Sequence, residues 1–490
     1  MALAQSTWHR IYSRYVSLSG TSFRCGIFGL GQPAVLLSAG TVVPGNSLKR
    51  EGGEPMTDSG VQLTAALLLD DLSEAERARA ERVEGVLGAL SNAAVEADQT
   101  ATFPMQHLTT LSDAGLLGLV VPESFGGMGG GLRDLAAATF AMGTVCPSTA
   151  LAFFFHSSSV SRGLLPLEAI EAGLFESAEV PVVQAFAERL LHRIGTEGKW
   201  MANFASESAK SASSSISIST AAEPATQDGV SGWVLNGVKS FGCATGVADH
   251  YLVTATFPGG DTAAYLGVFI VDRDAAGVGE RAKWDAIGMR ATATHGITLD
   301  NVFVAAEDAL AVPGAFPTMM QVSRGSFVGS QLAGTAVYLG AAAAVYRHTL
   351  NHLRTTRFAD TGQPIGTAPF QQQLIGQMTE DFEIAKQFLV RQLHLETSEP
   401  PILDKDSVVA QWRVAKGTVA ERGFAVAMGA LKANGTSGTG NTGLVARMFR
   451  DLSMGLVQAF PSERGKLEAA AMMMTGSGTT QFAGTSKPHG

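Results

Sequence analysis

The spacing of apolar residues along the chain changes twice, and this change constrains the fold more than any single motif. From 73 to about 191 the apolar positions repeat at helical intervals, as in Val83, Val86, Leu87 and Leu90, which places them on one face of a helix. From about 194 to 311 the repeat becomes two residues, in short runs separated by Gly, Asp and Pro, as in an antiparallel sandwich or barrel. After Pro313-Gly314 the helical spacing returns. The pattern predicts an α+β chain with a β-domain between two helical parts.

The same pattern predicts the domain boundaries. We expect an N-terminal helical domain at 56–193, a middle β-domain at 194–311, a C-terminal helical bundle at 312–476 and a tail at 477–490. Within the last domain, the stretches long enough to form a four-helix bundle are 332–353, 371–395, 408–431 and a fourth that starts at 443.

Residues 1–55 differ in composition from the rest and are expected to be a disordered extension. The first 50 residues contain five Lys or Arg, no Asp or Glu, and many Ser and Gly. Organelle transit peptides share this composition, whereas the stretch that begins at Met56 reads like a natural start. A start codon assigned upstream of Met56, an expression scar and a mitochondrial transit peptide are therefore alternatives. Unless residues 1–55 are a transit peptide, the expected location is the cytoplasm.

Charge and cysteine content exclude several kinds of protein. A formal net charge of −9 argues against a nucleic-acid partner, which requires clustered Lys and Arg. The apolar runs are far shorter than the ~20 residues that cross a bilayer, so no membrane partner is expected. Cys25, Cys146 and Cys243 are too few and too scattered for a disulfide framework or a structural zinc site. We therefore expect no metal and a reducing compartment.

Two segments of the predicted β-domain are the most informative motifs of the chain. They are Leu235 to Phe241, in which Asn236-Gly237 has the composition of a tight hairpin turn, and Trp284 to Thr292. Other motifs follow in order on both sides, at 113–129, 146–150, 354–371 and 448–451. This series, over about 400 of the 490 residues, resembles the acyl-CoA dehydrogenase family. The resemblance implies an N-terminal helical domain, a middle antiparallel β-sandwich or barrel, a C-terminal four-helix bundle, a flavin and a small-molecule substrate.

The resemblance also implies which residues face the flavin ring. By position they are Phe204, Ser206, Phe241 and Cys243. Ser206 is expected to donate a hydrogen bond, and Phe241 stands where the family usually has an aromatic residue, although it is also typical of a β-sandwich core. Cys243 replaces a common hydroxyl with a weaker donor, so hydrogen bonding to the flavin is expected to depend more on the backbone.

For the rest of the cofactor, the resemblance implies FAD, with FMN as the alternative. The family holds the pyrophosphate and adenine with residues of a neighbouring subunit, so a homotetramer is expected. The matching positions here are Arg354, Arg357, Phe358, Gln371, Asn434 and Gly435. Either arginine fits, because one more residue than usual separates Arg354 from Phe358.

The carboxylate that members of this family use as a base is missing. Oxidising an acyl thioester requires a base to remove the α-proton, usually a Glu nine residues after the Arg of an Arg-Asp pair. Nine residues after Arg450 this chain has Ala459, and the stretch 323–330, where a few members carry the Glu, contains no acid. The catalytic residue is therefore unknown. His156 and Ser462 are candidates for the substrate pocket, although a buried core histidine and a helix cap explain them equally well.

Three functions follow from these observations. The first is a flavin-dependent oxidoreductase acting on the CH–CH bond of an acyl thioester or related substrate, with an electron-transfer flavoprotein as partner. The second is a monooxygenase of an aromatic or sulfur compound that receives reduced flavin from a flavin reductase, because the stretch 458–464 resembles that subgroup of the family. The third is a non-catalytic flavin-binding protein that kept the fold.

Overall fold

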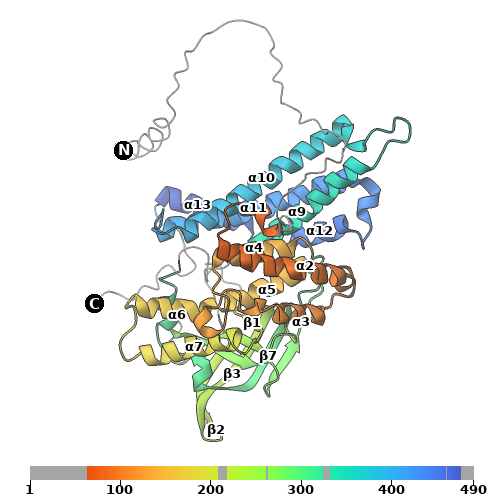
Figure 1. Ribbon diagram of the computed structural model, residues 1–490. Coiled ribbons are helices and arrows are strands. Elements are labelled where there is room, and N and C mark those ends of the chain that lie inside the picture. The colour runs from red at the N-terminus through yellow and green to blue at the C-terminus, as the bar shows by residue number, and fades with distance from the viewer. Residues whose placement is uncertain (1–62, 208–217, 261–262, 324–330, 459–460, 476–490) are drawn as a thin grey trace, which may run out of the picture. The chain divides into compact units, whose positions relative to one another are not determined.

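The computed structural model describes residues 63–207, 218–260, 263–323, 331–458 and 461–475. Its N-terminal part is helical (Figure 1) and consists of α2 (Glu74–Thr100), α3 (Met105–Asp113), α4 (Leu132–Gly143), α5 (Pro147–Ser159), α6 (Ser161–Glu171) and α7 (Val180–Gly195). Helix α2 begins where it does because Ser73 and Glu76 form a capping box, each side chain accepting a hydrogen bond from the other residue's backbone N–H. The predicted extension, residues 1–55, lies outside the described residues.

One eight-stranded, mostly antiparallel sheet follows. Its strands are β1 (Met201–Phe204), β2 (Ala221–Gln227), β3 (Val230–Gly242), β4 (His250–Thr256), β5 (Leu266–Asp272), β6 (Val278–Arg281), β7 (His295–Ala305) and β8 (Ala309–Leu310). The order is β6-β7-β3-β2-β4-β5-β8, and β1 pairs in parallel with β4. The α+β fold class and the position of the sheet between two helical parts are as predicted.

The predicted hairpin turn at Asn236-Gly237 is wrong. Both residues lie inside β3, which pairs with β2 on one side and β7 on the other, and the register with β7 shifts between Leu235 and Gly237. Gly237 is at φ 157°, and a Cβ there would lie 2.7 Å from the backbone of Thr220, so the glycine allows a bulge rather than a turn. The β2–β3 reversal is instead at Asp228-Gly229, both at positive φ (51° and 81°), as a tight hairpin requires.

The C-terminal part is helical again. After the short α8 (Ala315–Met319) come four long or medium helices, α9 (Gln331–Thr355), α10 (Pro369–Thr397), α11 (Lys405–Asn434) and α12 (Leu444–Met454), and then α13 (Ser462–Thr475). No helix of the described part is long and apolar enough to cross a membrane.

Helix α9 is pressed closely against α4, and this contact fixes its position. A Cβ on Gly340 would lie 2.1 Å from the Phe140 carbonyl oxygen, and a Cβ on Gly143 would lie 2.5 Å from that of Val337. The Thr139 hydroxyl adds a hydrogen bond of 2.7 Å to the Ala333 carbonyl. Because the two backbones approach at glycines, the residues of α9 that follow Val337 have a defined place in the interior.

Candidate active site

The ends of β1 and β3 meet and form one wall. The Ser240 N–H donates a hydrogen bond of 3.0 Å to the Ser206 carbonyl. Phe204 is fully buried and packs against Tyr251, and a Cβ on Gly242 would lie 2.5 Å from the Phe204 ring. The structure therefore brings together the two segments that the sequence predicts for the flavin. Ser206 is exposed and available to a ligand, whereas Phe204 offers only its backbone.

Phe241 and Trp284 form an aromatic edge on this wall. Phe241 is 49% exposed, which is unusual for a large apolar residue at a strand end, and its ring meets Trp284 edge to face at 5.5 Å. Trp284 is held in place by its N–H groups, which bond to His295 Nδ1 and to the Met289 carbonyl at 2.8 and 2.9 Å. An exposed, rigid aromatic pair fits the face of a planar ring. Trp284 stands in one of the two β-domain motifs, but nothing in the sequence indicates that it pairs with Phe241.

Cys243 belongs to a directed chain of hydrogen bonds. Its sulfur lies 3.0 Å from Thr294 Oγ1, which lies 2.6 Å from Thr292 Oγ1, and the Thr292 hydroxyl donates to the Met289 carbonyl at 3.0 Å. Since each hydroxyl has one proton, Thr294 must donate to Thr292 and Cys243 to Thr294. Burial raises the pKa of the Cys243 thiol to about 12, so it stays protonated. Its S–H is thus committed to Thr294 and is not available to a flavin.

A buried ion pair supports the wall from behind. Lys239 Nζ lies 2.7 Å from Glu207 Oε1, with side chains 0% and 3% exposed. The backbone N–H and hydroxyl groups of Ser219 and Thr220 also donate to the Glu207 carboxylate. Burial alone would raise the pKa of Glu207, but the hydrogen bonds from Lys239, Ser219 and Thr220 lower it to about 2. Glu207 is therefore a fixed structural anion and has no free oxygen with which to act as a base.

Helix α12 clamps the Trp284 loop. The Met289 N–H donates a hydrogen bond of 2.6 Å to Asp451 Oδ1, and a Cβ on Gly288 would lie 2.0 Å from the Arg450 carbonyl oxygen. Arg450 also pairs with Asp98 at the end of α2. Asp451 is 2% exposed, and burial raises its pKa to about 6 although the Met289 N–H and Arg447 oppose the shift. The Arg-Asp motif thus positions the wall.

A second group of predicted residues meets at the far end of the bundle. The Gln371 side chain donates a hydrogen bond of 3.1 Å to the Ala433 carbonyl, and Asn434 donates to the Thr349 hydroxyl at 3.0 Å. Gln371 Oε1 is buried and has no hydrogen-bond partner among the residues that the structure describes, so it leaves an acceptor for a ligand. Gly435 follows at φ 60°.

The other residues of this group lie beside it on the surface. Arg354 and Arg357 are exposed, and neither forms an ion pair with any residue in the described part of the chain. Phe358 is half-buried, in a turn that its N–H closes onto the Gln363 carbonyl. Tyr338 of α9 lies near Cys243 of the wall, and Arg354 is about 24 Å farther along the helix, at 1.5 Å per residue. One chain therefore does not bring this group to the wall.

The two predicted pocket residues are already bonded within the protein. His156 is fully buried, its Nε2 2.9 Å from the Leu117 carbonyl and its Nδ1 accepting from the Met201 N–H at 3.0 Å. Burial lowers its pKa to about 4, so it is a neutral histidine that joins α5 to β1. Ser462 begins α13 and donates a hydrogen bond of 2.5 Å to Glu421. Neither geometry leaves a group for a substrate, so their role in the pocket has no support from these contacts.

The described residues fit a flavin at the wall and at the bundle end. The exposed Ser206 hydroxyl, the Phe241–Trp284 edge and the unpaired Gln371 oxygen are all groups that a bound ligand would complete. No cluster of metal-ligating residues occurs among the residues described. A polar cleft of about 820 Å³ along α7 contains none of the predicted site residues.

Three family models match the chain, one for each part of the fold. The acyl-CoA dehydrogenase N-terminal domain matches residues 73–167, the middle domain 202–302 and the C-terminal domain 332–460. Together they cover more than half of the chain.

Individual relatives point to two kinds of enzyme. L-evernosamine nitrososynthase of a Micromonospora species is 32% identical over 50% of this chain and 54% of its own length, so the match spans about half of that protein. The putative acyl-CoA dehydrogenase YdbM of Bacillus subtilis is 25% identical over 78% of this chain and 93% of its own. The structure of KijD3 in complex with FMN and an amino-sugar nucleotide superposes with a TM-score of 0.67 at 21% identity, over 84% of this chain and 96% of that one. The chain therefore belongs to the acyl-CoA dehydrogenase family of flavin-dependent oxidoreductases.

Proposed function

We propose that the chain is a monooxygenase that uses reduced flavin and O₂ to oxidise a neutral nitrogen-containing, sulfur-containing or aromatic compound. One oxygen atom enters the product and the other leaves as water, with two electrons from the flavin. The observation that carries the proposal is the missing base: position 459 is Ala, and 323–330 contains no acid. Of the carboxylates described near the wall, Glu207 and Asp451 are both bonded to the backbone or to Lys239.

In this proposal the residues of the wall bind and orient but do not remove a proton from carbon. Ser206 and the backbone at 241–243 would hold the polar groups of a flavin, and Phe241 with Trp284 would pack against it. When bound, reduced flavin supplies the electrons that activate O₂. The thiol and hydroxyls of Cys243, Thr294 and Thr292 keep the neighbouring surface neutral. A wall whose described carboxylates, Glu207 and Asp451, are already bonded suits oxygen chemistry, which needs no base to remove a proton from carbon.

The identity of the flavin and the oligomeric state are part of the same proposal. We retain FAD, because Gln371, Asn434 and the exposed arginines remain available to an adenine nucleotide, with FMN, which the KijD3 complex contains, as the alternative. A second copy, in a homotetramer, would bring the bundle end to the wall. A flavin reductase is the partner, and the cytoplasm remains the proposed location.

A specific observation keeps acyl-CoA dehydrogenation, with an electron-transfer flavoprotein as partner, as the second candidate. The match to YdbM extends over 93% of that protein, whereas the match to the nitrososynthase covers 54%. A dehydrogenase would need a relocated base, for which Glu463 at the start of α13 is the nearest acid in the sequence.

Anaerobic titration of the flavin-loaded protein with butyryl- and octanoyl-CoA separates the two. We expect no loss of the oxidised-flavin absorption, because a general base contributes ~10²–10⁴-fold. Ala459→Glu tests whether a carboxylate at position 459 allows acyl-CoA to bleach the flavin, and Ala459→Gln is the uncharged control of equal size. Rapid bleaching by the wild-type protein, abolished in Glu463→Gln, would contradict the monooxygenase. Incorporation of ¹⁸O from ¹⁸O₂ into a heteroaromatic product would support it.

A further inference from the structure

The loop between β6 and β7, which carries Trp284, has a strained backbone. Ala282, Met289 and Ala293 lie in the left-handed region, at φ 48°, 50° and 46°, where a Cβ is unfavourable. Residues in such conformations persist only where the surrounding structure holds them. The position of Trp284 on the wall therefore depends on the anchors of this loop.

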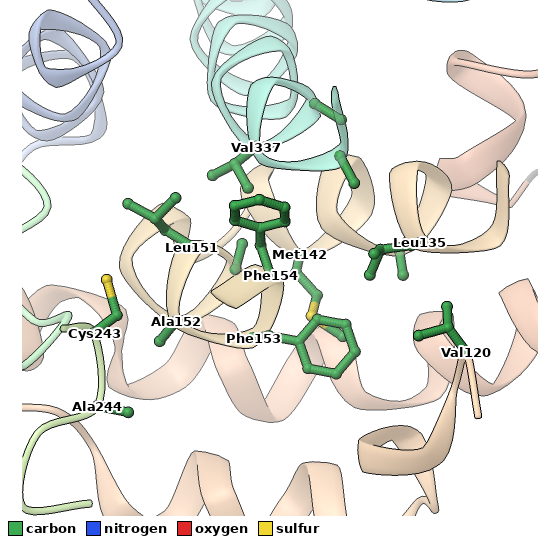
Figure 2. Close-up of a cluster of buried hydrophobic side chains, with 14 of the residues drawn as sticks. Val120, Leu135, Met142, Leu151, Ala152, Phe153, Phe154, Cys243, Ala244 and Val337 are labelled. Atoms are coloured by element: carbon green, nitrogen blue, oxygen red, sulfur yellow. The ribbon is translucent and has the colours of Figure 1, made fainter. Parts of the chain in front are cut away.

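The end of the loop next to β7 is fastened to the packed interior. The N–H groups of Ala244 and Thr245 donate hydrogen bonds of 2.9 Å to the carbonyls of Thr292 and Ala293. Ala244 is fully buried, and Figure 2 shows it in one buried cluster with side chains of α5. Because close-packed side chains leave no space for movement, this end of the loop is fixed.

The Trp284 end is held by an imidazole instead. The Trp284 backbone N–H donates a hydrogen bond of 2.8 Å to Nδ1 of His295, the first residue of β7. Since a backbone N–H can only donate, Nδ1 must be unprotonated, and the neutral ring carries its proton on Nε2. A proton on Nδ1 would place two N–H groups face to face. The anchor thus exists only while His295 is neutral.

The charged groups around His295 come from β6 and from the loop. Glu280 and Arg281 belong to β6, which pairs with the start of β7, and β3 meets His295 at Gly242, which has no side chain. Burial lowers the pKa of His295, Glu280 opposes the shift, and Lys283 of the loop adds to it. The imidazole is therefore neutral above pH ~6.5 and becomes charged as the pH falls below that value.

We propose that neutral His295 positions Trp284 for flavin binding, and that protonation of His295 releases the Trp284 end of the loop and weakens flavin binding. The inference rests on the proposed placement of the flavin at the wall and adds its regulation by pH. It does not depend on the oxygen chemistry. His295 is a positioning residue, because it acts through Trp284.

Three variants separate the acceptor of the imidazole from its charge. His295→Asn keeps an acceptor oxygen near the place of Nδ1 and does not titrate, whereas His295→Leu removes the acceptor. The matched control is His250→Asn in the same sheet, because burial also lowers the pKa of His250, but its Nδ1 has no hydrogen-bond partner among the residues described.

Two measurements are made on the full-length protein at about pH 7.5 and about pH 5. The first is the dissociation constant for FAD and for FMN, from the quenching of flavin fluorescence. We expect the wild-type value to rise on the order of tenfold in acid, relative to His295→Asn, as the loss of one hydrogen bond allows. His295→Leu should bind weakly at both pH values, and His250→Asn should follow the wild type.

The second measurement is the hydrogen-exchange protection of the Trp284 amide in the flavin-free protein. Protection should fall in acid for the wild type, stay high for His295→Asn and be low at both pH values for His295→Leu. Asp451, which holds Met289 in the same loop, also titrates. Burial raises its pKa to about 6, so acid favours the folded state through Asp451, and its contribution is the same in His295→Asn.

Two results would overturn the role of His295. One is a Trp284 amide whose protection has the same pH dependence in the wild type and in His295→Asn, beside normal flavin binding. The other is His295→Asn that melts like the wild type and yet binds flavin as weakly as His295→Leu. If the Trp284 amide follows the expected pattern but neither flavin binds at either pH, the placement of the flavin at the wall is wrong, and the two failures are thereby distinguished.

Discussion

Replacing Lys239 with methionine tests whether the buried ion pair holds the wall. The pair is almost fully buried, at 0% and 3% exposure, and breaking a buried pair costs ~3–5 kcal/mol. Four donors from Ser219 and Thr220 remain on Glu207, so the lower end applies. The fall in the pKa of Glu207 to about 2 reports the combined effect of Lys239, Ser219 and Thr220, and burial lowers the pKa of Lys239 itself, so the pKa does not isolate the contribution of Lys239. From the cost of breaking a buried pair we expect a loss of about 3 kcal/mol at pH 7.

Urea unfolding followed by tryptophan fluorescence measures this loss. Because the folded-state pKa of Glu207 is lowered, its stabilisation is present above pH ~4.5 and disappears as the pH falls toward 2, so the difference between Lys239→Met and wild type should shrink in acid. Lys283→Met, at an exposed position of the same sheet domain, is the control and should change stability by less than ~0.5 kcal/mol. A loss below ~1 kcal/mol for Lys239→Met would refute the reasoning, since Ser219 and Thr220 would then hold Glu207 alone.

Three further predictions concern the wall, its clamp and the N-terminal extension. Gly242→Ala places a Cβ 2.5 Å from the Phe204 ring and should lower the free energy of unfolding by ~1–3 kcal/mol and weaken flavin binding. The control is Gly85→Ala in α2, where nothing lies within 4 Å of the added Cβ, and it should do neither. Equal melting temperatures for the two variants would argue against the clash. Because burial raises the pKa of Asp451 to about 6, the protein should become less stable as the pH rises from ~4 to 6. Asp451→Asn keeps an acceptor for the Met289 N–H and should flatten the profile of melting temperature against pH. An unchanged slope would show that Asp451 does not cause this pH dependence. Deleting residues 1–55, which precede every matched domain, should leave circular dichroism and flavin absorption unchanged, and insoluble protein would contradict this.

The sequence was sufficient for the fold class because hydrophobic periodicity reports which face of each element is buried. It failed at Asn236-Gly237, since a glycine that permits a bulge and a glycine that permits a turn have the same composition. What decides between them is Thr220, which immediately precedes β2 and whose backbone approaches Gly237. Local sequence does not contain that contact.

The site was partly predictable for a related reason. Residues close together in a motif, such as Phe241 and Cys243, could be placed on one wall. Gln371 and Asn434 lie near each other, since Gln371 bonds to the Ala433 carbonyl, and their roles remain predictions. The direction of the Cys243 thiol depends on Thr294, 51 residues away, and the position of the Trp284 loop depends on Asp451 of α12. Both require the tertiary structure.

The clamp by α12 has a consequence for protein engineering. The wall is made of β-strands, yet the loop that carries Trp284 is fastened by Asp451 and by the Arg450 carbonyl against Gly288, more than 150 residues later in the chain. A chimera that exchanges only the middle segment with a relative would join a loop to a foreign anchor. The exchangeable unit is therefore the strands together with α12, and segment boundaries drawn along the sequence do not coincide with it.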